Sequence, residues 1–299
     1  MRCTSRKAWR FAAGTITAAL FAACSTAPST APQNPVLTQP EANAVAEVVA
    51  TDAASLASGA TFDAATGMPF ALVPMPGAPA MGPSSTSCTP TRSPLPVTNS
   101  DGDPVPDSVN IDFTGCTFTG NGNTATLSGS IDIVDPTPLT TDRSFRTRSH
   151  DFTRSLTNTT TGTTRSVVEN GVRSVVGTAD QIQLADTMTT DYTFATNATA
   201  SHARKWLATF TADQPGSIQV GSRLPSGNWS IAGSSTFTSS TNSYSLSAST
   251  GPALHFNASC TVEPRFDSGT LTVMVTKGTA STTVTIQFTA CGQYTVTRS

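Results

Sequence analysis

Alternation of apolar and polar residues is the clearest pattern in the last two thirds of the chain. In 270–276, Leu and Val alternate with Thr and Met, and in 283–289, Val, Ile and Phe alternate with Thr and Gln. A period of two residues is typical of strands that bury one face and expose the other to water. Threonine favours extended backbone and keeps the exposed face polar without adding charge. The pattern therefore predicts an all-β domain over residues 109–299.

Turn residues divide this domain into roughly a dozen expected strands. Short connections favour antiparallel pairing, because parallel neighbours need long crossovers. Asn170-Gly171 is the strongest hairpin signal, since this dipeptide suits tight turns between antiparallel strands. We therefore predict an antiparallel meander that forms a curved sheet, a half-barrel or a sandwich. The strands are expected at 111–118, 124–134, 166–169, 172–176, 188–196, 203–212, 229–238, 244–250, 253–262, 270–276, 282–290 and 294–298.

One helix is predicted ahead of the sheet, over residues 40–57. Thr38 and Glu41 have the spacing of a capping box, and Pro40 suits the first helical turn. Gly59 is a typical residue at a helix end. The stripe of Ala and Val is weakly apolar, so we expect the helix either to pack on the β domain or to form a loose stalk. Its apolar positions are Val45, Val48, Val49 and Leu56.

Residues 1–23 have the features of a secretory signal peptide. Four basic residues precede a short apolar run over 11–23, which is too short to span a bilayer. A tether rich in Ser, Thr, Pro and Ala is expected over 24–39. Between a helical segment at 40–67 and the β domain lies a Pro-rich segment at 68–108, which we expect to be extended because proline breaks helices and sheets.

The end of the signal segment resembles a bacterial lipobox. Ala22 and Ala23 match the small residues of that family, and Cys24 matches its lipid-bearing cysteine. Phe21 stands in place of the usual Leu. The resemblance implies a diacylglyceryl thioether on Cys24, cleavage before it and acylation of the new amino group, because a stable anchor needs several chains. Ser25 resembles the outer-membrane sorting residue of Gram-negative lipoproteins. An ordinary secretory peptide with an incidental cysteine is the alternative.

Composition and charge limit the classes of partner that the protein can bind. Of 299 residues, 88 are Ser or Thr, 12% are charged and three are Lys. Loss of residues 1–23 removes four basic and no acidic residues, which leaves 13 basic and 19 acidic ones and a net charge of −6. An acidic surface disfavours nucleic acid and adsorption to anionic lipid. We therefore expect an exported protein that reaches the membrane through its anchor, with other envelope proteins or lipid as further partners.

Four cysteines remain once Cys3 is lost with the signal peptide and Cys24 carries lipid. An even count indicates two disulfides, with three possible connectivities. The pattern V-x-I-x-F-T-x-C occurs at 109–116 and at 284–291, and a Cys-Thr pair lies upstream of each. Chance recurrence of a strand pattern is the alternative to this similarity. We favour two local bridges, each worth about 3–4 kcal/mol, which would pair Cys88 with Cys116 and Cys260 with Cys291.

Side-chain oxygens cluster just before the β domain, at positions 1, 3, 5, 9 and 12 of a twelve-residue frame. These residues are Asn99, Asp101, Asp103, Asp107 and Asn110. Calcium needs six to eight oxygen ligands, which clustered carboxylates can supply. The stretch resembles one thrombospondin type-3 calcium repeat, with Pro104 in place of a glycine, and this resemblance implies a structural calcium ion. An acidic loop without metal is the alternative.

Catalytic motifs such as Gly-x-Ser-x-Gly, HExxH and a phosphate loop do not occur in the sequence. The three histidines, His150, His202 and His255, are not clustered, so we expect neither catalytic residues nor a transition-metal site. A hydrolase would need a histidine, a carboxylate and a nucleophile to converge. A basic run is interpreted either as an anion-binding patch or as a solvated strand face. Its residues are Arg143, Arg146, Arg148 and Arg154.

The function expected from the sequence is a non-catalytic structural, binding or interaction role in the bacterial envelope, with structural calcium as the one cofactor considered. The alternative is a carrier that holds an acyl chain, because the strand count is similar to that of the periplasmic lipoprotein-carrier families. A continuous apolar concave face would favour the carrier. A filled core would favour the structural role, which we call the scaffold.

Overall fold

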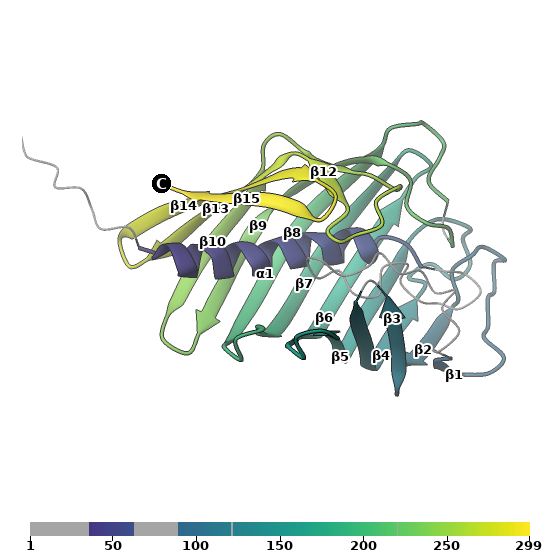
Figure 1. The fold of residues 1–299 in the computed structure, drawn as a ribbon. Coiled ribbons are helices and arrows are strands. Elements are labelled where there is room, and N and C mark those ends of the chain that lie inside the picture. The colour runs from purple at the N-terminus through teal and green to yellow at the C-terminus, as the bar shows by residue number, and fades with distance from the viewer. Residues whose placement is uncertain (1–35, 63–88, 121, 220) are drawn as a thin grey trace, which may run out of the picture. The chain divides into compact units, whose positions relative to one another are not determined.

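One antiparallel sheet and one helix account for the regular structure. The computed structural model describes residues 36–62, 89–120, 122–219 and 221–299 (Figure 1). The strands are β1 (Thr91–Ser93), β2 (Ser108–Asp112), β3 (Cys116–Gly120), β4 (Asn123–Val134), β5 (Phe145–Asn158), β6 (Thr164–Gly177), β7 (Gln181–Thr193), β8 (Thr199–Ala212), β9 (Gly227–Ser239), β10 (Ser243–Thr250), β11 (Leu254–Phe256), β12 (Phe266–Ser268), β13 (Thr270–Lys277), β14 (Ala280–Ala290) and β15 (Gln293–Arg298).

These strands form a single sheet of 15 members. Its main path runs β1-β2-β4-β5-β6-β7-β8-β9-β10-β13-β14-β15, while β3 pairs with β4 and β11 pairs with β9 and β12. Most neighbours in the sheet are also neighbours in the chain, as expected for a meander. The predicted all-β class, with an antiparallel curved sheet and one N-terminal helix, is confirmed.

The helix α1 spans Gln39–Ser58, one residue more at each end than predicted. The capping box is present, because Thr38 Oγ1 accepts from the Glu41 backbone nitrogen and Glu41 Oε2 accepts from the Thr38 nitrogen at 2.8 Å. Gly59 ends the helix by donating its backbone N–H to the Ser55 carbonyl at 3.0 Å. Within the described residues, no helix combines the length and the apolar character that crossing a membrane requires.

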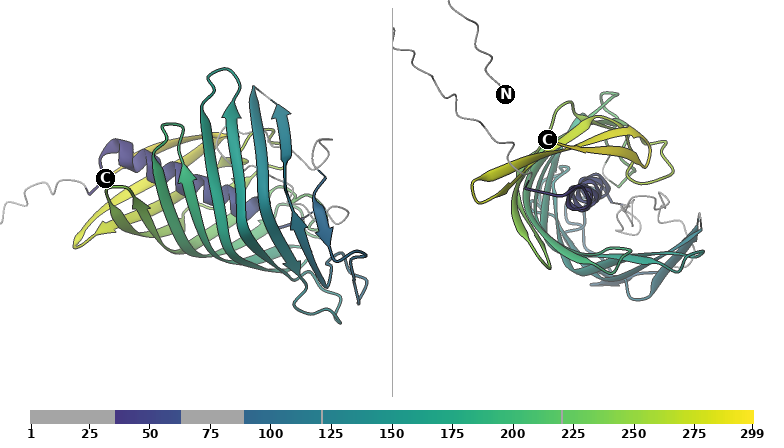
Figure 2. Two further views of the ribbon diagram at one scale, coloured as in Figure 1. Left: turned by 90° about the horizontal axis from the view of Figure 1, so that it is seen from below. Right: turned by 60° about the vertical axis from the view of Figure 1, so that its left-hand side comes forward.

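The sheet curves around α1, which lies inside the curve between the yellow C-terminal strands and the teal strands (Figure 2). The helix contacts β7, β14 and β15. The predicted alternation supplies the inner face: Leu271, Val273 and Val275 of β13 are fully buried, while Met274 between them is exposed. Of the two expectations for the helix, packing on the β domain is therefore the one found.

Asn170 and Gly171 do not form the predicted hairpin, because they lie in the middle of β6. That strand pairs along its length with β5 and β7. The Asn170 side chain donates to Asp151 Oδ1 at 2.9 Å and accepts from the Asp151 nitrogen at 2.8 Å, which holds a β-bulge in β5. At Gly171 a Cβ atom would lie 2.3 Å from the Thr187 carbonyl oxygen. Asn170 therefore stabilises a bulge, and Gly171 allows close contact with β7, in place of the predicted turn.

The predicted disulfide between Cys260 and Cys291 is confirmed, with Cα atoms 5.6 Å apart. The strand predicted over 253–262 is shorter than expected, because β11 ends at Phe256 and the Asn257 side chain then accepts from the Ser259 nitrogen in a turn. Cys116 is buried in β3 and is disulfide-bonded. Its expected partner, Cys88, lies outside the described residues.

The described residues from Val36 to the end of β15 form one compact unit that includes α1 and all the strands. The chain is packed from Val36 onward, where the backbone nitrogen donates to Thr282 Oγ1 at 2.9 Å. Leu37 is fully buried, and its carbonyl accepts from the Arg298 guanidinium. The last residues of the segment predicted as a tether therefore lie against β14 and β15. The predicted signal peptide and Cys24 lie outside the described residues.

Candidate functional site

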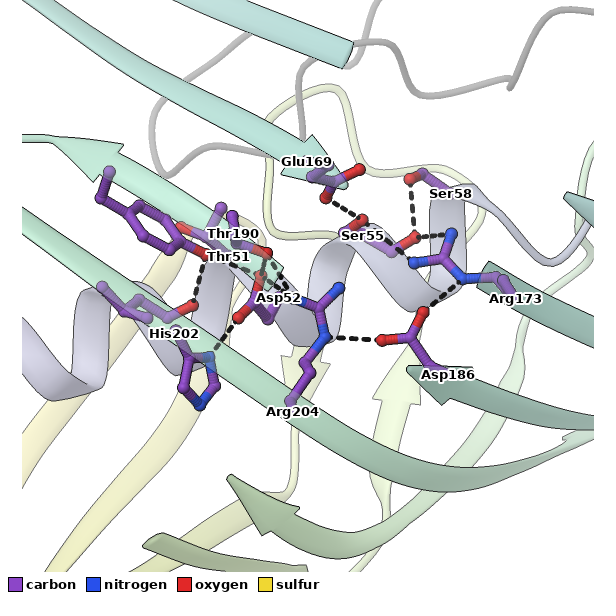
Figure 3. Close-up of polar contacts among 12 residues, drawn as sticks. Thr51, Asp52, Ser55, Ser58, Glu169, Arg173, Asp186, Thr190, His202 and Arg204 are labelled. Atoms are coloured by element: carbon purple, nitrogen blue, oxygen red, sulfur yellow. Dashed lines mark hydrogen bonds and ion pairs between the residues drawn. The ribbon is translucent and has the colours of Figure 1, made fainter. Parts of the chain in front are cut away.

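Charged and polar side chains form a buried layer between α1 and the concave face of the sheet (Figure 3). Strand alternation brings them there, since inward positions of β7 and β8 are buried while the positions between them are mostly exposed. We call this layer the α1 network. Its members are Asp52, Ser55, Arg154, Glu169, Arg173, Asp186, Thr190, Tyr192, His202 and Arg204.

Asp52 is the centre of one half of the α1 network. Its Oδ2 lies 2.5 Å from His202 Nδ1, and its Oδ1 accepts from the Tyr192 hydroxyl at 2.6 Å. Arg204 Nη1 lies 2.7 Å from the same Oδ1. Burial by itself would raise the pKa of Asp52, but the charge of Arg204 and the hydrogen bond with His202 outweigh burial and place this pKa below its ordinary value. Asp52 is therefore a fully buried carboxylate that stays ionised.

Asp186 links two arginines in the middle of the layer. Its Oδ2 lies 2.6 Å from Arg204 Nε, and its Oδ1 lies 2.9 Å from Arg173 Nε. Arg173 extends to the end of α1, where Nη1 donates to the Ser55 carbonyl at 3.0 Å. The last turn of α1 has no basic residue of its own, so this arginine supplies positive charge at the negative end of the helix dipole. Gly59 leaves room for it, because a Cβ atom there would lie 1.7 Å from Arg173 Nη1.

Glu169 forms the other end of the network. Its Oε1 accepts from the Ser55 hydroxyl at 2.7 Å, and its Oε2 pairs with Arg154 Nη2. Both side chains of this ion pair are only 4% exposed. Burial lowers the pKa of Arg154, and the charge of Glu169 opposes that effect. An ion pair this deeply buried contributes mainly by holding its two elements in one arrangement, because breaking it leaves a charge without solvent.

The α1 network balances its own charge, with three carboxylates facing three guanidinium groups. The Asp52–His202 contact is the pairing that orients a general base in hydrolases. However, His202 is fully buried, and its Nε2 has no hydrogen-bond partner, so no described hydroxyl or thiol is placed for activation. A general base must reach a substrate proton, directly or through one water. This geometry therefore supports a structural role for the histidine.

Two openings adjoin α1. A partly open cavity of about 30 Å³ lies beside the network, between Phe62 and Phe152, and it has room for one or two water molecules. A wider surface groove of about 590 Å³ lies at the N-terminal end of α1 and includes Phe194, Phe237 and Tyr244. Small-molecule pockets usually measure about 300–1,000 Å³. The cavity that the described residues form beside the network is therefore too small for an acyl chain, and the larger space is an open surface groove.

The structure brings together two of the five residues predicted to bind calcium. Asp101 and Asp103 lie close to one another, whereas Asp107 accepts from the Ser100 backbone nitrogen at 2.8 Å. Asn110 points elsewhere and donates to Asp132 at 2.7 Å. Asn99 belongs to the loop but uses its side chain internally, accepting from the Gly102 nitrogen and donating to the Asp103 carbonyl.

A third carboxylate, Asp135, joins Asp101 and Asp103 from a different part of the chain. One oxygen of each residue lies within 4.8 Å of the other two. Burial raises the pKa of Asp103, and the negative charges of Asp101 and Asp135 add to that effect. Sequence reasoning missed Asp135 because β2, β3 and β4 separate it from the acidic loop in the chain. The one available signal was its place directly after the predicted strand 124–134 and before Pro136, which indicates a turn.

The basic run does not form a single patch. Arg146 and Arg148 are exposed on the outer face of β5, whereas Arg154 is buried on the inner face in the α1 network. Arg143 donates to the Ile218 carbonyl. The bulge in β5 is the reason, because one extra residue moves every later side chain to the opposite face.

The two remaining histidines lie apart from the α1 network. His150 Nε2 lies 2.7 Å from Asp132 on the exposed side of the sheet. His255 lies between Asp213 and Asp267, at 3.0 and 2.6 Å. Each histidine thus has an acidic partner, and none shares a site with another.

Comparison with protein-family models, with curated proteins and with solved structures found no match.

Proposed function

We propose that this chain is an exported, lipid-anchored protein of the bacterial envelope, in the outer membrane, with a non-catalytic structural, binding or interaction role. The observation that carries the role is the α1 network, which holds the helix inside the curved sheet by buried ion pairs. A concave face filled in this way acts as a rigid core. Partners would then meet the outside of the protein, and they would be other envelope proteins or lipid.

Export is supported by the disulfide between Cys260 and Cys291. Disulfides persist in oxidising compartments and are rare where cellular thiols keep cysteines reduced. The anchor rests on the lipobox resemblance at Cys24 and is a separate part of the proposal.

An acyl-chain carrier is the second candidate, favoured by the strongly curved antiparallel sheet. To open its concave face, α1 would have to leave, which would separate Asp52 from Arg204 and Ser55 from Arg173. Removing one partner from a buried ion pair typically costs about 3–5 kcal/mol. Binding of an apolar chain would have to supply that free energy, so the geometry favours the scaffold.

The anchor is tested by expressing the full chain with Cys24→Ser and, as a matched control, with Cys3→Ser. We expect the unchanged protein and the control to be acylated and to sediment with membranes, and Cys24→Ser to lose both properties. Intact-mass spectrometry reads the acyl groups directly. A mature protein that begins at another residue, or that carries no acyl chain, contradicts the anchor.

The role is tested by titrating the purified protein with a fluorescent fatty acid. A scaffold gives no saturable binding, and native mass spectrometry finds no stoichiometric lipid beyond the anchor. Saturable binding of one acyl chain per protein would favour the carrier. Equal binding by Asp52→Asn and the unchanged protein would place such a chain outside the α1 network.

A further inference from the structure

Three carboxylates converge where the loop before β2 meets the end of β4. One oxygen from each of Asp101, Asp103 and Asp135 lies within 4.8 Å of the other two. The pairing of β2 with β4 brings them together, because Ser108 at the start of β2 lies opposite Val134 at the end of β4. The sheet therefore fixes this cluster, although Asp135 lies 32 residues after Asp103 in the chain.

Two of the three residues are buried, and some oxygens of the cluster lack partners. Asp103 is 5% exposed and Asp135 is 4% exposed. Asp135 Oδ1 accepts from the Thr137 nitrogen at 2.7 Å, whereas Asp135 Oδ2 and Asp101 Oδ2 are shielded from solvent without a hydrogen-bond partner. The ion pairs found among the described residues all involve other carboxylates.

Three neighbouring negative charges at this depth repel one another, and water cannot solvate the two shielded oxygens. Such a group is stabilised when a cation lies between the carboxylates. The donors are all oxygens, which suit hard cations such as calcium, magnesium or manganese better than copper or zinc. Calcium accepts irregular arrangements of six to eight oxygens, whereas magnesium demands a near-ideal octahedron.

We propose that Asp101, Asp103 and Asp135 bind one calcium ion, with solvent supplying its remaining ligands. This site differs from the twelve-residue frame of the sequence, because it includes Asp135 and leaves out Asp107. The ion would join two loops that already touch, since Thr141 Oγ1 donates to the Asp101 carbonyl. Its effect is to fasten the β4–β5 connection to the loop that leads into β2. The inference is independent of the lipid anchor and of the proposed role.

The test is thermal melting and calorimetric titration of the purified protein after removal of metal with EDTA. With a dissociation constant of about 10⁻⁴–10⁻³ M, as in extracellular calcium modules, about 10 mM calcium should raise Tm by roughly 3–10 °C. Asp135→Asn should abolish this rise. Asp107→Asn, in the same loop but outside the cluster, should keep it.

The metal-free state gives a second readout. Without calcium, Asp135→Asn should melt at or above the temperature of the unchanged protein, because one repelling charge is gone and the amide oxygen can still accept from Thr137. If that variant does not fold, Asp101→Asn takes its place, since Asp101 is only half-buried. Absence of both heat and a Tm rise in the unchanged protein overturns the proposal. The proposal is also overturned if calcium raises the Tm of Asp135→Asn as much as that of the unchanged protein, or if Asp107→Asn loses the rise. A rise with magnesium alone overturns it as well.

Discussion

Replacing Asp186 with Asn measures how much the α1 network stabilises the fold. The substitution keeps the size of the side chain but removes the charge that Arg173 and Arg204 share at 2.9 and 2.6 Å. Removing one partner of a buried ion pair costs about 3–5 kcal/mol. Arg204 keeps its ion pair with Asp52, and Arg173 keeps its hydrogen bond to the Ser55 carbonyl. We therefore expect a cost at the lower end of this range. Asp186→Asn should therefore lower the free energy of unfolding by about 3 kcal/mol.

The measurement is urea unfolding followed by tryptophan fluorescence, with a thermal melt as a second probe. A loss of about 3 kcal/mol lowers Tm by roughly 6–12 °C in a domain of this size. Asp191→Asn is the matched control, because Asp191 lies on the same strand but is exposed on the opposite face. It should change stability by less than about 0.5 kcal/mol. If Asp186→Asn costs less than about 1 kcal/mol, or no more than the control, Asp186 does not stabilise the fold through its two arginines.

Two further changes test other contacts. Gly59→Ala should cost about 1–3 kcal/mol in urea unfolding, because its new methyl group displaces the Arg173 guanidinium, and a loss below about 0.5 kcal/mol would contradict the packing. The hydrogen bond to Asp213 raises the pKa of His255 above its ordinary value of 6.5; burial opposes this rise and Asp267 reinforces it. The protonated histidine therefore stabilises the fold fully below pH 6.5, and this contribution is lost as the pH rises through the raised pKa. The stability of His255→Gln should fall less over that window, and parallel pH profiles would refute the assignment.

Features that depend on neighbours in the chain were predictable from the sequence. The capping box at Thr38 and Glu41 and the end at Gly59 set the limits of α1. The period of two residues placed β13, β14 and their buried faces correctly, and the Cys260–Cys291 bridge followed from the motif that recurs at 109–116 and 284–291. The capping and alternation signals lie within about one element of the residues that they describe. The hairpin signal at Asn170-Gly171 is just as local, yet pairing of β6 with β5 and β7 overrides it.

The α1 network could not be predicted, because its partners come from separate elements. Asp52 meets His202 at a separation of 150 residues, and Ser55 meets Glu169 at 114. A single residue of bulge in β5 decides that Arg154 faces inward, while simple alternation groups it with the exposed arginines. The same limit applied to the carboxylate cluster. Its third member depends on which strand lies beside β2, and hydrophobic pattern does not encode that pairing.

The ends of the described fold depend on each other. Val36 is bonded to Thr282 and Leu37 to Arg298, across separations of 246 and 261 residues. Contacts between residues so far apart in the chain slow folding, because the long intervening segment must close into a loop before they form. α1 precedes every strand in the chain, yet the two residues that lead into it, Val36 and Leu37, bond to β14 and β15. The start of α1 therefore depends on strands far along the chain, and loss of the six residues of β15 would remove the partner of the Leu37 carbonyl.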